Sequence, residues 1–288
     1  MIEASSQSQA RPATATRAAA RTNWRTVLLG VHSALMYVFL YAPIVILVLF
    51  SFTTDSFGAR LTGFTFSWYT KLLQDERLMG AAWNTLTVAL VSTIISTIIG
   101  TLTALAMERY RFRGRTATDA LLYLPIVIPE IVMALALLAF FAFMFGIIQN
   151  ITGSQLKMSL TTVIISHIAF SISFVVVVVR ASLKGFDRRL EEAARDLGAN
   201  EWQTFWRITF PLILPGIIGG ALLAFTISLD DFIISFFTTG PGTSLLPIEV
   251  YAQVKRAVTP KINAISTVML VISMTLVALS QFVQRQRR

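Results

Sequence analysis

The sequence contains no cysteine and only two histidines among its 288 residues. Without cysteine, disulfides and thiolate metal sites are excluded, and the redox compartment cannot be inferred. His32 and His167 cannot build a metal site by themselves, so we predict no bound metal. Charged residues are also scarce, at 14% of the chain, whereas soluble domains carry about a quarter. This shortage indicates a protein of the lipid bilayer.

Apolar residues make up 55% of the chain and gather in long runs. A helix needs roughly 20 such residues to cross ~30 Å of hydrocarbon. Spanning segments should be helical, because isolated strands cannot pair their backbone polar groups in lipid. We therefore predict an all-α membrane protein with one six-helix domain over residues 29–284. The predicted spans are residues 31–52, 84–107, 120–145, 160–180, 212–236 and 263–283.

The basic residues are distributed unevenly between the predicted loops. Most of the 24 lie in the two tails, in the short loop after the second span and in residues 181–210. Because cytoplasmic loops carry an excess of Lys and Arg, both termini are predicted to be cytoplasmic. The net charge of +9 then reflects membrane topology and not nucleic-acid binding. Residues 1–28 are too polar to offset the entropy of ordering and are predicted to be a disordered tail. Residues 285–288 form a basic C-terminal tail.

Residues 181–210 form a long polar interval between the fourth and fifth spans. Asp187 is predicted to cap a first short helix, and Asn200 with Gln203 forms a capping box that opens a second. Gly198 lies where the first helix should end in a left-handed turn. One apolar stripe follows the helical period of the first helix, through Leu183, Phe186, Leu190, Ala193, Ala194 and Leu197. Such a stripe is typical of a helix that binds a partner, or of an amphipathic linker on the membrane surface.

This interval also carries a narrower pattern. Glu192-Ala193-Ala194 is followed after three residues by Gly198, after nine more by Ile208, and then by Pro211. The spacing resembles the EAA loop of permease subunits of ABC importers, the loop that contacts the ATPase. The family pattern usually has Leu before the proline, where this chain has Phe210.

The resemblance extends over nearly the whole chain from about residue 30. The segments that carry it are Tyr110-Arg111-Phe112-Arg113-Gly114, residues 180–187, Ser228-Leu229-Asp230-Asp231-Phe232, Thr239-Gly240-Pro241-Gly242, Leu246-Pro247, residues 254–256, Thr259-Pro260 and Asn263-Ala264. Together they are similar to the second, C-type permease subunit of spermidine/putrescine ABC importers.

The resemblance implies a type I ABC importer permease of the bacterial inner membrane. Its partners would be a cytoplasmic ATPase dimer, a second and different permease subunit, and a periplasmic polyamine-binding protein. ATP would be bound by the ATPase, and this chain has no phosphate-binding Gly-x-x-x-x-Gly-Lys-Ser/Thr run. The chain is therefore expected not to be an enzyme and to need no cofactor of its own. The residues expected to form the coupling helix are Leu190, Glu192, Ala193, Ala194, Leu197 and Gly198.

Three acidic residues fall within the predicted spans, where a carboxylate costs several kcal/mol to insert. Glu130 follows two prolines and is placed near mid-membrane, whereas Asp230 and Asp231 fall near the outer end of the fifth span. Spaced carboxylates suit a polyamine because each of its ammonium groups donates hydrogen bonds. The alternative for the aspartates is that they cap a broken helix or pair with Lys255 or Arg256.

Other functions remain open at this stage. The same family architecture would serve another cationic or small organic solute, and the sequence does not identify which polyamine is carried. An ion-coupled secondary transporter would also have six spans and buried acids, but it would not need an ATPase-docking loop. A membrane-embedded enzyme is disfavoured, because no nucleophile, base and acid are grouped in the sequence.

Overall fold

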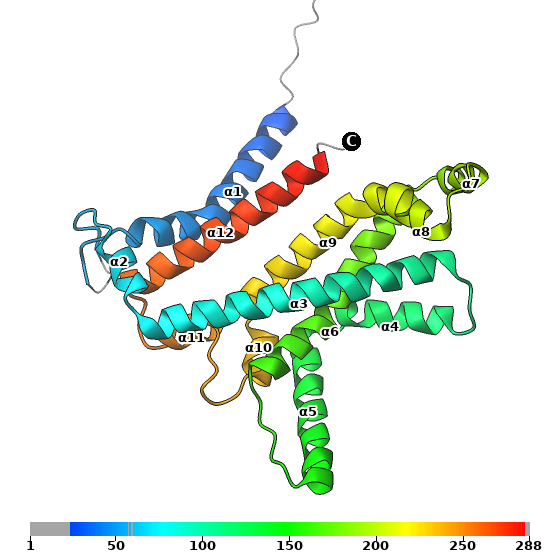
Figure 1. Cartoon of the computed structure of the whole chain (residues 1–288). Helices are drawn as coiled ribbons and strands as arrows, with labels where there is room; N and C mark the ends of the chain where they lie inside the picture. Colours follow the sequence, from blue (N-terminus) through cyan, green and yellow to red (C-terminus); the bar gives the residue numbers. More distant parts are fainter. Residues whose placement is uncertain (1–23, 57, 59, 286–288) are drawn as a thin grey trace, which may run out of the picture. The chain divides into compact units, whose positions relative to one another are not determined.

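The computed structural model describes residues 24–56, 58 and 60–285, and these residues form helices joined by loops (Figure 1). The predicted disordered tail lies outside them as far as residue 23, whereas residues 24–28 already belong to the first helix. Of the predicted basic tail, residues 286–288 also lie outside them. The elements are α1 (Trp24–Phe50), α2 (Ser67–Leu73), α3 (Glu76–Arg109), α4 (Arg115–Val127), α5 (Glu130–Thr152), α6 (Leu160–Lys184), α7 (Arg189–Asp196), α8 (Glu201–Thr204), the π-helix η1 (Phe205–Thr209), α9 (Phe210–Asp230), α10 (Ile233–Thr238), α11 (Leu246–Val254) and α12 (Pro260–Arg285).

The chain divides into two compact units, the first ending at Ile46 and the second beginning at Leu47. Most of α1 belongs to the first unit. Every other helix belongs to the second unit, which contains the buried core and the candidate sites.

The core of the second unit lies where α6 packs between α3 and α9. Its largest cluster of buried side chains contains Ala104, Leu105, Val175, Val176, Val179, Leu183, Ile213 and Ala224. Glycines allow the helix backbones to come close, as is usual where helices pack in membranes. A Cβ atom added at Gly100 of α3 would lie 2.8 Å from Val175 of α6, and one added at Gly216 of α9 would lie 2.1 Å from the Ser182 hydroxyl oxygen. These two contacts leave no room for a larger residue.

Six helices among the described residues are long and apolar enough to cross a membrane: Trp24–Phe50, Glu76–Arg109, Glu130–Thr152, Leu160–Lys184, Glu201–Asp230 and Pro260–Ala278. Four of them overlap the predicted first, second, fourth and sixth spans closely. The other two differ from the prediction, in both cases because the backbone leaves the helical conformation inside a continuous apolar run.

The third predicted span, 120–145, is interrupted by a break in the helix. α4 ends at Val127, Ile128 is extended with ψ 136°, and Pro129, which has no N–H to donate, precedes α5. The helix long enough to span is therefore α5, about ten residues later than predicted. Glu130 consequently lies in the first turn of α5 and not midway along a helix, which corrects the depth expected from the sequence.

The fifth predicted span, 212–236, is broken as well. α9 ends at Asp230, Asp231 is extended with ψ 122°, and the short helix α10 follows. At the other end, α6 continues to Lys184, so the polar loop begins at Gly185 and not at residue 181.

Asp75 connects the beginning of α3 to α12. Its carboxylate accepts hydrogen bonds from the backbone N–H groups of Arg77 and Leu78, both at 3.1 Å, and so caps α3. The ammonium group of Lys261 pairs with the same carboxylate. The hydrogen bond from Lys261 holds the pKa of Asp75 below its ordinary value of 3.8.

This depressed pKa predicts a contribution to stability that depends on acid pH. The stabilisation is fully present above pH 3.8 and is lost as the pH falls through 3.8 towards the lower native pKa. Asp75→Asn retains an N-cap but not the charge. We expect its thermal midpoint to fall less than that of the native protein between pH 5 and pH 3. The control is Asp196→Asn, an exposed acid of α7. A pH profile of Asp75→Asn equal to the native one would contradict the prediction.

Candidate functional site

The loop between α6 and α9 has the predicted capping box and left-handed turn, whereas the N-cap of α7 is Arg188 and not Asp187, one residue later than predicted. Asp187 Oδ1 accepts the backbone N–H of Arg189 at 3.0 Å, at the start of α7. Asn200 and Gln203 form the capping box, with bonds of 2.8 and 3.1 Å. Gly198 has φ +86°, in the left-handed region, so it turns the chain between α7 and α8. We call residues 185–209 the helix-pair loop.

Apolar side chains near the beginning of α7 and directly after its end are exposed. Leu190 is 47% exposed and Leu197 is 89% exposed. Glu192 and Ala193 are also exposed, and Ala194 is half-buried. The predicted coupling residues thus lie together on an outer surface of the helix-pair loop, where a partner protein has access to them.

Glu191 holds α7 against the transmembrane helices. It is the buried residue of α7, at 9% exposure, and its carboxylate accepts hydrogen bonds from Arg109 at the end of α3 and from the hydroxyl group of Thr209 in η1. Arg188 adds a bond of 2.9 Å from its guanidinium group to the carbonyl oxygen of Glu108. α7 and the residue before it are therefore fixed to α3, and α7 to η1, by charged hydrogen bonds.

The sequence did not identify Glu191 as a functional residue. It stands next to Glu192, which the family resemblance singles out, and it lies off the apolar stripe. The one available signal was its spacing: Glu191 and the half-buried Ala194 are three residues apart and share a helix face.

The acidic residues of the predicted spans occupy different environments. Asp230 is exposed at the end of α9, and Glu130 is half-buried in the first turn of α5. Asp231 is only 7% exposed and accepts the backbone N–H of Ser235 at 2.8 Å, so it caps α10. The carboxyl group of Glu130 lies within hydrogen-bonding reach of that of Asp231.

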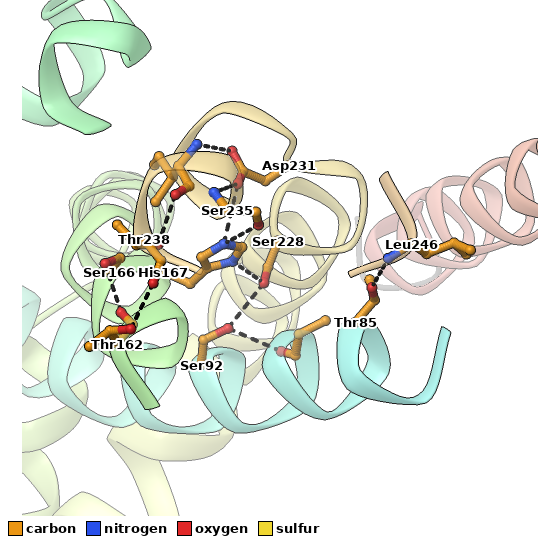
Figure 2. Close-up of polar contacts among 12 residues, drawn as sticks. Thr85, Ser92, Thr162, Ser166, His167, Ser228, Asp231, Ser235, Thr238 and Leu246 are labelled. Atoms are coloured by element: carbon orange, nitrogen blue, oxygen red, sulfur yellow. Dashed lines mark hydrogen bonds and ion pairs between the residues drawn. The ribbon is translucent and has the colours of Figure 1, made fainter. Parts of the chain in front are cut away.

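His167 of α6 lies beside Asp231 inside a buried polar cluster (Figure 2). Its Nε2 atom is 3.2 Å from Asp231 Oδ2. The ion pairs found among the described residues do not join Asp230 or Asp231 to Lys255 or Arg256, the pairing that the sequence left open. Asp231 instead caps a broken helix, which was the other structural alternative.

In the described part of the chain, no three His, Cys, Asp or Glu side chains are grouped so that they would hold a metal ion.

A family model for binding-protein-dependent transport system inner membrane components matches residues 96–286. The chain belongs to this family. It is 41% identical over 261 residues to the spermidine/putrescine transport system permease protein PotC of Escherichia coli K12, covering 91% of this chain and 95% of the relative. It is 38% identical to the putrescine transport system permease protein PotI of the same organism, covering 87% of this chain and 86% of the relative.

A solved structure shares the fold of this inner membrane component. A bacterial ABC transporter that imports the acidic polysaccharide alginate superposes with a TM-score of 0.73, covering 91% of this chain and 96% of that chain at 21% identity. This likeness confirms the predicted all-helical fold of an ABC importer permease. Family membership confirms a multi-pass transport component of the inner membrane, not an enzyme. Such a component works with an ATPase and a binding protein.

The position of Glu191 predicts how firmly the helix-pair loop is held. Glu191→Ala removes the carboxylate that accepts hydrogen bonds from Arg109 and Thr209, at a cost of about 1–3 kcal/mol. We expect trypsin to cleave the loop of this variant at least about fivefold faster, because 1 kcal/mol of lost stability raises the open population by that factor. The measurement is limited digestion of the inserted chain without its ATPase.

Glu192→Ala is the matched control, since it removes the same group from the next, exposed residue. Its loop should be cleaved at the native rate. Equal cleavage of both variants would show that Glu191 does not fasten the loop.

Proposed function

We propose that this chain is the permease subunit of an ATP-driven importer that moves spermidine, putrescine or both from a periplasmic binding protein into the cytoplasm. The observation that carries the proposal is the 41% identity to a spermidine/putrescine permease along 91% of the chain. Relatives that match over nearly their full length share the architecture that surrounds the substrate path. The second relative, a putrescine permease, has a substrate of the same chemical class.

The acids at the helix breaks support a cationic substrate. Asp230 is exposed at the end of α9, near the outer end of the predicted span, and a carboxylate is more stable facing water or a polar partner than facing lipid. The side chain of Asp230 must therefore face water or another subunit. Glu130 lies nearby, since its carboxyl group reaches Asp231, the next residue after Asp230. We assign Asp230 and Glu130 to the polyamine path, where charge-assisted hydrogen bonds hold ammonium groups in passing.

The helix-pair loop is the proposed contact with the ATPase. Its exposed apolar residues Leu190, Ala193 and Leu197 would fill a groove on one ATPase subunit of the dimer, with Glu192 and Ala194 beside them. Gly198 would allow the turn that presents them. We propose that ATP is bound by that partner. Both termini and the loop then lie in the cytoplasm, in agreement with the excess of basic residues there. A second, different permease subunit completes the pore.

A second candidate is an importer of another cationic or small organic solute. The permease fold accommodates different solutes, because a transporter of an acidic polysaccharide shares it with this chain. The exposed carboxyl group of Asp230 favours cations within that range.

The proposal is tested by uptake of radiolabelled spermidine and putrescine. Cells without polyamine importers of their own would express the chain with its ATPase, partner permease and binding protein. Uptake that requires the chain supports the proposal and ranks the substrates. If the complex assembles and hydrolyses ATP but imports neither compound, the substrate assignment is wrong and the permease assignment stands.

Gly198 gives a separate prediction for the coupling role. Gly198→Val forces a β-branched residue into φ +86°, which costs about 1–3 kcal/mol and displaces the turn after α7. We expect uptake to fall at least tenfold while the chain still inserts into the membrane. Gly114→Val is the matched control, because Gly114 has φ +92° in the turn before α4 and, like Gly198, has open space around it. A similar loss in both variants, or normal uptake in the first, would contradict a specific role of the loop.

A further inference from the structure

His167 joins three segments of the protein through its two ring nitrogens. Nδ1 lies 2.6 Å from Ser228 Oγ of α9. Nε2 lies 3.0 Å from Ser235 Oγ of α10 and 3.2 Å from Asp231 Oδ2, in the break between these helices. The imidazole is 2% exposed, and Figure 2 shows it enclosed by these partners.

The hydrogen bonds fix the direction in which the ring is held. Asp231 accepts hydrogen bonds from two backbone N–H groups. A carboxylate has no proton to donate, so Asp231 must also be the acceptor in its hydrogen bond with His167. Nε2 therefore carries a proton, and Nδ1 is hydrogen-bonded to the hydroxyl group of Ser228. Ser228 in turn lies 3.2 Å from Ser92 Oγ, which extends the cluster to α3. Each member has a partner, and in a dry interior such a network specifies one arrangement.

α10 is fastened to α6 at both of its ends. His167 holds the N-terminal end through Asp231. Thr162, five residues earlier in α6, donates a hydrogen bond of 2.7 Å to the carbonyl oxygen of Thr238, the last residue of α10. α10 therefore has little freedom to turn or slide on α6.

This attachment separates the roles of two adjacent aspartates. Asp231 points inward to His167 and is buried, whereas Asp230, one residue before it, is exposed. The direction of Asp230 is set by the backbone at the break, and the break is held by the bond between Asp231 and His167. Asp231 is thus not free to bind substrate.

We infer that His167 is a positioning residue of the transport path, which holds Asp231 inward and thereby presents Asp230 to the passing ammonium groups. The inference rests on the proposed function for the identity of the substrate. His167 itself does not contact the substrate. Asp231 faces His167 and does not line the path.

The first test is uptake by the complete transporter in two backgrounds. His167→Ala should lower the initial uptake rate at least fivefold at a saturating concentration of binding protein, and Asp231→Asn should do the same. In an Asp230→Asn background, His167→Ala should lower the rate less than twofold further, because the side chain that it positions no longer carries a charge. His32→Ala, which changes the chain's other histidine in α1, should leave uptake within twofold of native.

A role in general stability would give a different result. His167→Ala would then lower uptake by the same factor in both backgrounds, and this outcome would overturn the inference. Native uptake by His167→Ala would overturn it as well. Preserved ATP hydrolysis by the complex shows that each variant still assembles.

The second test needs no polyamine. Because the chain has no cysteine, Asp230→Cys introduces a single thiol for a cationic thiosulfonate reagent. We expect His167→Ala to change its labelling rate at least threefold, since the backbone at residue 230 is no longer fixed. Thr226→Cys, one turn earlier in α9, is the control and should keep its rate within twofold.

An unchanged rate at residue 230 would overturn the positioning role whatever the substrate is. If polyamine uptake fails in the native transporter while the labelling rate changes as expected, the proposed substrate is wrong and the positioning role stands. The two conclusions are therefore tested independently.

Discussion

The packing of α6 between α3 and α9 is the interaction on which the other features depend. Val175 illustrates it: added Cβ atoms at Gly100 of α3 and at Gly220 of α9 would lie 2.8 and 3.4 Å from its side chain. Lipid supplies little hydrophobic driving force between helices, so close packing of small residues has to hold them together. With α6 fixed in this way, residues at its two ends keep defined positions. One end carries His167 and the other leads into the helix-pair loop.

Breaks in membrane helices require compensation, because an unpaired backbone group in hydrocarbon costs several kcal/mol. The break after α9 is compensated by a side chain. Asp231 accepts hydrogen bonds from backbone N–H groups at the start of α10. The contact of His167 with the Asp231 carboxylate offsets part of the free energy needed to bury that carboxylate. At the break before α5, Pro129 has no backbone N–H group, so no side chain is needed to accept a hydrogen bond from that residue. The two breaks bring Glu130 and Asp231 within reach of each other, although about 100 residues separate them in the sequence.

The sequence predicted the features that depend on local chemistry. The capping box of Asn200 and Gln203 and the left-handed turn at Gly198 are confirmed, because each depends on residues within a few positions. The long apolar runs likewise indicated six spans. Hydropathy alone did not locate the breaks inside two of those runs, because the residues on both sides of each break are equally apolar. Glu191 and His167 were not identified as functional because their partners are distant: Arg109 lies 82 residues from Glu191, and Ser228 lies 61 residues from His167. Their roles appear only when the helices are packed.

The two candidate sites are connected by two helices that run between them. η1 leads directly into α9; its Thr209 is bonded to Glu191 of α7, and α9 ends at Asp230. With 21 residues at ~1.5 Å each it extends ~30 Å, the thickness of the hydrocarbon core. α6 runs alongside, with His167 near its beginning and the loop after its end. α9 is held near its beginning by the bond between Glu191 and Thr209, and near its end by the bond between Ser228 and His167. A displacement of α7 would therefore be transmitted along α9 to the break at Asp231. In the proposed importer, this arrangement allows an event at the ATPase to change how Asp230 faces the path, without any contact between the ATPase and the substrate.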